Sequence, residues 1–119
     1  MPIFALILAA PTPLTEVHQR DISCVVEIAV LANSQKRGIV AGSDVQAKGR
    51  RWAGIVGDRI MFETGQPREL VAVALNEAAQ ARAARAINDA TVAACTKQMN
   101  KELAIADAAE APLPKPVKQ

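Results

Sequence analysis

Aromatic residues are scarce in this chain of 119 residues, which contains no Tyr, two Phe and one Trp. Half of the sequence is hydrophobic, but 24 of these residues are Ala. A core of methyl groups and short aliphatic side chains suits closely packed helices and suits an aromatic-rich β-sandwich poorly. The composition therefore predicts an all-α protein, and the length is enough for one small domain with its own core.

Residues that bind metals or act as nucleophiles are also few. Cys24 and Cys95 are the two cysteines, 71 positions apart, and His18 is the one histidine, so no zinc-ligand spacing exists. His18 and Cys24 are six residues apart and would point to different sides of one helix, which disfavours a Cys–His catalytic pair. No carboxylate pair reveals an acid and a base. We expect no enzyme activity, no catalytic residue and no bound metal.

No hydrophobic run approaches the roughly 20 residues of a transmembrane helix. The longest run, residues 3–10, has eight apolar residues, which fits the hydrophobic part of a secretory signal. We therefore interpret residues 1–11 as an export leader. However, no basic residue precedes the run, and cleavage after Ala10 would place Leu8 at −3 and Pro11 at +1. The alternative is an uncleaved apolar segment that packs on the domain.

The charge is nearly balanced, with 14 basic and 12 acidic residues and a net charge of +2. Long-range attraction to nucleic acid is therefore weak. Gly49, Gly54 and Gly57 lie near basic residues, but the sequence has neither the Gly-Lys-Ser/Thr of a phosphate loop nor the glycine spacing of a dinucleotide fold. We predict no nucleic-acid partner and no cofactor.

The first helical segment begins with Thr12 as the predicted N-cap and Pro13 in the first turn. Its apolar residues recur at intervals of three and four, which predicts an amphipathic helix with a buried face of Val17, Cys24, Val25, Ile28, Leu31 and Ala32. The β-branched residues in 24–31 leave a buried strand as the alternative, although Glu27 interrupts it. A loop is predicted over 32–44.

A second helix is predicted over 44–63, because Ser43 and Gln46 match a capping box. Val45, Trp52, Ile55, Val56 and Ile60 lie on one side of it, and Gly65 ends it. Three internal glycines weaken this helix. We interpret Gly54 and Gly57 as positions where a neighbouring helix packs closely.

A third helix begins at Pro67 and continues through an Ala-rich stretch. Leu70, Val73, Ala74 and Ala78 are predicted to face the core, and Arg82 and Arg85 to point outward. Residues 86–89 form either a turn or a kink before the fourth segment, whose apolar face is Val92, Cys95, Met99, Leu103 and Ala106.

The last nine residues, 111–119, contain three prolines and are predicted to be a disordered tail. No repeat or linker divides the sequence before this tail. We therefore predict one domain over 12–110, an antiparallel bundle of three to four helices.

The two cysteines lie on the apolar faces of the first and last predicted helices. In an exported protein this placement favours one structural disulfide between Cys24 and Cys95. In a reducing cytosol both residues would be small buried hydrophobes.

The charge is uneven in one place, residues 36–59, which include six basic and two acidic residues. Arg50, Arg51 and Trp52 are the candidate partner-binding residues, because Arg and Trp are enriched at binding hot spots. Trp52 is equally suited to be the one large residue of an Ala-rich core, in which case the basic residues form a solvated end of the bundle.

These observations favour a small exported, non-catalytic helical protein, periplasmic or secreted, that acts through protein contact. The alternative is a cytoplasmic helical adaptor or regulatory protein with two free buried cysteines. The sequence identifies neither the protein partner nor the oligomeric state.

Overall fold

The computed structural model describes residues 12–39, 45–82 and 85–110. Within these ranges the chain forms four α-helices and no strand, and the helices are α2 (Glu16–Lys36), α3 (Gln46–Thr64), α4 (Arg68–Arg82) and α5 (Asp89–Glu110). The prediction of an all-α fold is confirmed, since 24–31 is helical. The predicted leader, 1–11, and the predicted tail, 111–119, lie outside the described residues.

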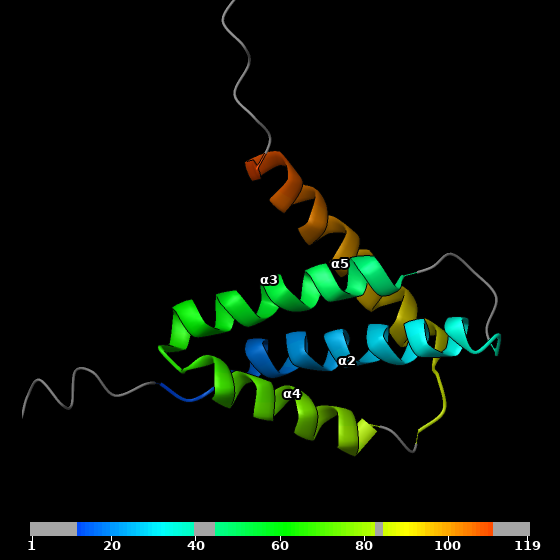
Figure 1. The fold of residues 1–119 in the computed structure, drawn as a ribbon, viewed down its shortest axis with the longest axis horizontal. Helices are drawn as coiled ribbons and strands as arrows, with labels where there is room; N and C mark the ends of the chain where they lie inside the picture. Colours follow the sequence, from blue (N-terminus) through cyan, green and yellow to red (C-terminus); the bar gives the residue numbers. More distant parts are fainter. Residues whose placement is uncertain (1–11, 40–44, 83–84, 111–119) are drawn as a thin grey trace, which may run out of the picture.

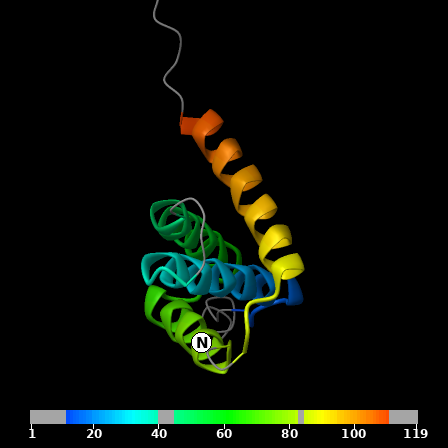
Figure 2. The same cartoon turned by 90° about the vertical axis from the view of Figure 1, so that its right-hand side faces the viewer.

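The bundle is organised around α2. Helices α2, α3 and α4 lie side by side with alternating chain directions (Figure 1). Helix α5 crosses behind α2 and α3 in Figure 1, so it lies on one face of this layer, as the turned view of Figure 2 shows. Helix α2 contacts all three other helices, and α3 also contacts α4 and α5, whereas α4 and α5 do not contact each other. None of α2 to α5 combines the length and hydropathy of a membrane span.

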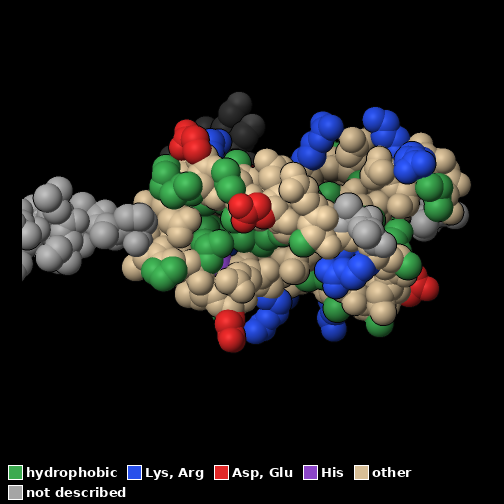
Figure 3. All heavy atoms as spheres, turned by 90° about the horizontal axis from the view of Figure 1, so that it is seen from below, with side chains coloured by type: hydrophobic (Ala, Val, Ile, Leu, Met, Phe, Trp, Pro, Cys, Tyr) green, Lys and Arg blue, Asp and Glu red, His purple; other side chains and the backbone are tan. Residues whose placement is uncertain are grey.

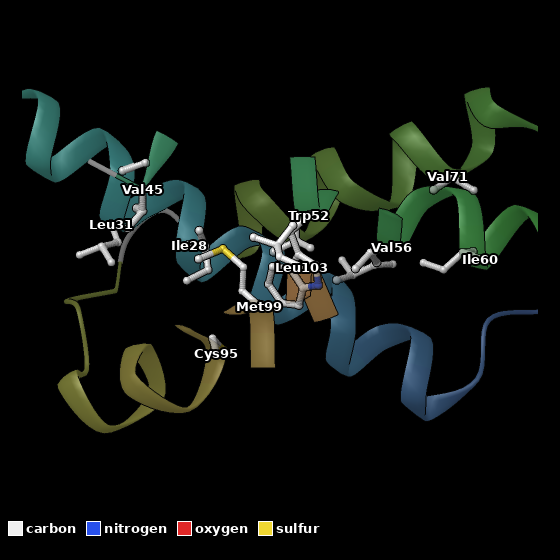
Figure 4. Close-up of a cluster of buried hydrophobic side chains, with 13 residues drawn as sticks. Ile28, Leu31, Val45, Trp52, Val56, Ile60, Val71, Cys95, Met99 and Leu103 are labelled. Carbon is white, nitrogen blue, oxygen red and sulfur yellow. The ribbon is translucent and has the colours of Figure 1, made fainter. Parts of the chain in front are cut away.

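The core is a cluster of aliphatic side chains around a single indole. Trp52 of α3, Ile28 of α2 and Met99 of α5 are each 0% exposed. Trp52, Met99 and Leu103 lie together at the centre of the cluster in Figure 4. The prediction that Cys95, Met99 and Leu103 form the buried face of the last helix is confirmed.

The predicted start of the first helix is wrong by three residues. Thr15, not Thr12, is the N-cap of α2, and its hydroxyl accepts a hydrogen bond from the His18 amide at 3.2 Å. Thr12 instead donates its amide to the Thr64 carbonyl at 2.8 Å, which holds the incoming chain against the end of α3. Val17, predicted to be buried, is 57% exposed because the rotation of α2 turns it to solvent.

The predicted loop over 32–44 is shorter in the structure. Helix α2 continues to Lys36, and Gly38 adopts φ 73°, a left-handed conformation that glycine tolerates well. Helix α3 begins at Gln46, two residues later than predicted, after Val45, which makes no side-chain cap. Ser43 of the predicted capping box lies outside the described residues. Gly65 ends α3 in a left-handed conformation, as predicted.

The glycines of α3 do not have the predicted roles. A side-chain carbon at Gly54 would meet nothing within 4 Å, so no helix packs closely there. At Gly57 the nearest atom is Val71 Cγ1 at 4.0 Å, an ordinary contact. The close approach is at Gly49, where a Cβ would lie 2.9 Å from Ile28 Cγ2. Gly49 therefore lets α2 and α3 pack closely at Ile28.

Helix α4 is rotated from the predicted orientation. Val71 is 4% exposed and belongs to the core, whereas Leu70 and Val73 are 49% and 48% exposed. Arg82, predicted to point outward, is buried because it has a carboxylate partner there, Glu27 of α2. Helix α4 is rich in Ala and has few large side chains that could fix its rotation. The ion pair between Arg82 and Glu27 therefore determines which face of α4 is buried more than the apolar pattern does.

Residues 85–88 are an irregular connection, so α4 and α5 are two separate helices and not one helix with a kink. Asn88 precedes α5, and its side-chain oxygen accepts a hydrogen bond from the Thr91 amide at 3.0 Å. This is the bond of an N-cap residue. The side chain of Asn88 thus allows α5 to start in a new direction.

Candidate functional site

The largest polar cluster of the described chain lies where α2, α3 and α5 meet, and Glu102 is at its centre. One oxygen of Glu102 accepts hydrogen bonds from Trp52 Nε1 at 3.0 Å and from Arg59 Nη2 at 2.7 Å. Its other oxygen accepts a bond from Gln98 Nε2 at 3.0 Å. Gln98 also donates to Asp21 at 2.8 Å, and Arg59 lies 3.6 Å from Asp21. This cluster links three helices.

Hydrogen bonds within this cluster stabilise the charged forms of Glu102 and Arg59. Burial alone would raise the pKa of Glu102, but the bonds donated by Trp52, Gln98 and Arg59 lower the pKa below its ordinary value of 4.5. Burial alone would lower the pKa of Arg59, but the bond to Glu102 and the nearby Asp21 raise it. A carboxylate with a lowered pKa that is already bonded at both oxygens is a weak general base. The cluster is therefore suited to holding helices together.

We expect the Glu102 carboxylate to make stability dependent on pH. Its lowered pKa means that its contribution is complete above its ordinary value of 4.5 and is lost as the pH falls through the folded-state value. Glu102→Gln should reduce the free energy of unfolding at neutral pH by about 1–3 kcal/mol, because charge-assisted hydrogen bonds are lost. Urea unfolding at a series of pH values should show the two proteins converging in acid.

Glu110→Gln is the matched control for this measurement, because Glu110 is a carboxylate on the same helix with a side chain that is 73% exposed. This control should follow the wild-type pH dependence closely. A constant stability difference between Glu102→Gln and the wild type at every pH would contradict the role assigned to the ionised carboxylate.

His18 lies next to this cluster, and its imidazole is committed to the fold. Its Nδ1 accepts the Thr15 amide at 3.1 Å, and its Nε2 lies 2.7 Å from Glu63 Oε1. Nδ1 must be unprotonated to accept, so Nε2 carries the proton and donates it to Glu63. With both ring nitrogens bonded and the residue 5% exposed, His18 closes the N-terminal cap of α2.

The cysteines form a pair across the bundle. Cys24 of α2 and Cys95 of α5 lie at disulfide distance, with their sulfur atoms 2.08 Å apart. Among the described residues, no group of His, Cys, Asp and Glu is arranged to hold a metal ion. The cysteine pair thus connects α2, the central helix, to α5, the last helix.

The three predicted partner-binding residues are placed in three different environments. Trp52 is buried, so it is the large core residue and not part of a binding surface. Arg51 is paired with Asp107 at 2.6 Å and with Glu110 at 3.3 Å, both on α5. Arg50 is exposed and lines a groove between α2 and α3. Of the three residues, Arg50 thus remains the candidate for partner contact.

This groove is one of two adjoining hollows over the C-terminal half of α2. The first, of about 260 Å³, lies between α2 and α3, and the second, of about 780 Å³, lies between α2, α4 and the α4–α5 connection. Val25, Ala29 and Asn33 line both hollows, so the two adjoin along α2. We call the combined surface the α2 groove. Its lining is largely apolar, with aliphatic residues from α2, α4 and the connection.

Among the described residues, the charged side chains that line the α2 groove are all basic. Lys36 and Arg50 line the first hollow, and Arg37 and Arg85 line the second, whereas no Asp or Glu from residues 12–39, 45–82 or 85–110 lines either one. In the view of Figure 3, Lys and Arg side chains gather toward the right-hand half of the molecule. The C-terminal part of α2 lies at this end of the bundle. An apolar floor with a basic rim is suited to an amphipathic, acidic ligand.

The wall formed by the α4–α5 connection is held by Arg82. Its Nε pairs with Glu27 of α2, and its two terminal nitrogens donate to the carbonyls of Arg85 and Ala86. Arg85 and Ala86 themselves line the α2 groove. Sequence reasoning missed this arrangement, because nothing in the spacing of Glu27 and Arg82, 55 residues apart, indicates that they pair.

Comparison with known proteins adds nothing to this assignment: no family model, curated protein or solved structure matches the chain.

Proposed function

We propose that the protein is an exported, non-catalytic helical protein that acts by binding another protein through the α2 groove. The observation that carries this proposal is the groove itself: two adjoining, largely apolar hollows whose charged lining residues, within the described parts of the chain, are Lys36, Arg37, Arg50 and Arg85. Contiguous apolar surface with a polar rim is typical of interaction sites. The rim would favour an acidic partner.

The proposed oxidising compartment, periplasmic or extracellular, is supported by the Cys24–Cys95 pair. The sulfur atoms of Cys24 on α2 and Cys95 on α5 lie at disulfide distance. Structural disulfides form and persist outside the reducing cytoplasm. The apolar run at residues 3–10 is consistent with export, as argued from the sequence.

A non-catalytic role is supported by how the polar side chains are used. His18, Glu102 and Asp21 are all engaged in bonds between or within helices. The described lining of the α2 groove, in contrast, consists of apolar, amide, hydroxyl and basic side chains and includes no carboxylate, histidine or cysteine. Such a lining can bind a partner, but it holds none of the usual acid or base groups.

Site-specific cross-linking in the cell that makes the protein tests this function. A photo-reactive amino acid at Ala29, which is exposed in the groove floor, should form adducts with a second protein. The same amino acid at Lys97, exposed on α5 outside the groove, should form none. Equal labelling at both positions, or adducts at Lys97 alone, would contradict a contact through the groove.

A further inference from the structure

The α2 groove is about as long as three turns of a helix. Helix α2 is flanked by α3 and α4 and backed by α5, so three of its sides are covered. Its fourth side is the groove floor, which extends along α2 from Val25 to Arg37. At 1.5 Å per residue this stretch is about 18 Å long, or roughly three helical turns.

The groove also favours a helix over an extended peptide. Its walls in the described chain are helices and one connection, so no sheet edge is available to pair with a strand. A helix satisfies its own backbone hydrogen bonds and needs from its host only an apolar surface. The aliphatic side chains of α2 and α4 supply that surface.

The distribution of charge specifies the partner further. Arg50 lies on the α3 side of the groove and Arg85 on the α4 side, while Lys36 and Arg37 lie at the C-terminal end of α2. A helix seated between the walls would therefore have basic groups on both flanks. Its complement carries an apolar stripe with carboxylates on each side.

On this basis, which rests on the proposed function, we propose that the partner of the α2 groove is an acidic amphipathic helix of another protein. The helix presents an aliphatic stripe of about three turns to Val25, Ala29 and their neighbours, and its flanking Glu or Asp side chains pair with Arg50 and Arg85. Binding adds a fourth neighbour to α2.

The test uses the full oxidised protein and a synthetic peptide of about 14 residues, long enough for the three turns. The peptide has Leu and Ala on one face and Glu on both flanks, with blocked ends. Titration followed by NMR should shift the amides of α2 and α4 that line the groove. A peptide of the same composition in scrambled order, and one with Lys in place of Glu, should leave them unchanged.

Two adjacent arginines provide matched variants. Arg50→Glu reverses a charge of the groove and should weaken peptide binding roughly tenfold, while Arg51→Glu, outside the lining and facing α5, should change it less than about twofold. At the floor, Ala29→Glu should abolish binding, and Ala29→Gln should retain it. Circular dichroism of each variant verifies folding, so a lost shift is attributed to the groove.

Several outcomes overturn the proposal. Equal binding of the scrambled peptide, equal effects of Arg50→Glu and Arg51→Glu, or shifts confined to α5 would each do so. Binding of phosphatidylglycerol vesicles at the groove without binding of the peptide would identify a lipid surface as the partner instead. If the peptide fails while Ala29 cross-links to a protein in the cell, the function stands and the acidic helix is the wrong partner.

Discussion

Loss of the Cys24–Cys95 bond is expected to lower the free energy of unfolding by about 4 kcal/mol, because it releases a loop of 71 residues in the unfolded chain. A domain of this size is typically stable by about 5–15 kcal/mol. Removal of the bond should therefore lower the melting temperature strongly. The effect should be global, since Cys24 is on the central helix and Cys95 on the last.

Chemical denaturation of the wild type and of Cys24→Ser, each with and without a reducing agent, measures this contribution. The reductant should destabilise the wild type and leave Cys24→Ser unchanged. Cys95→Ser serves as the second variant, because it breaks the same bond from the other side. Equal stability of the oxidised and reduced wild type would show that the bond contributes nothing to the fold.

Trp52→Ala is expected to cost about 3–5 kcal/mol, the usual cost of removing a large aromatic side chain from a core. Trp52 is 0% exposed and lies among the buried residues of α2, α3 and α5. The substitution also removes the hydrogen bond that its indole donates to Glu102. Urea unfolding followed by far-ultraviolet circular dichroism measures the loss without relying on the tryptophan itself.

Trp52→Phe separates the two contributions, since it retains an aromatic ring and removes the N–H donor. Its cost should be clearly smaller than that of Trp52→Ala, with about 1–3 kcal/mol attributable to the bond to ionised Glu102. A loss below about 1 kcal/mol for Trp52→Ala would place the indole at the surface, contrary to its position in the core.

The helices could be predicted from sequence because their signals are local. Cys95, Met99 and Leu103 recur every four residues and predict one buried face, which the structure confirms. Gly65 marked the end of α3 for the same reason, since glycine tolerates its left-handed conformation. Both Thr12 and Thr15 could be the N-cap of the first helix. In the structure Thr12 bonds to Thr64 and Thr15 is the N-cap, and the sequence does not reveal the contact between Thr12 and Thr64.

The candidate site depended on long-range contacts and could be predicted only in part. Arg50 was identified from local charge, but Arg85 comes from a segment 35 residues later and reaches the groove through the packing of α4. Arg82 was assigned to the surface because an arginine in an Ala-rich helix is usually solvated. Its burial depends on Glu27, a partner that only the packing of α2 against α4 reveals.

The most direct test of an exported, disulfide-linked protein is the intact mass of the protein isolated from its own cell, measured before and after reduction. Export predicts a mass below the 12.6 kDa of these 119 residues by the mass of the removed N-terminal residues. The disulfide predicts a gain of about 2 Da on reduction, as two thiol hydrogens are added, and no reaction with a thiol reagent beforehand. A chain that begins at Met1 or Pro2 and whose two thiols react upon denaturation without reductant would contradict both.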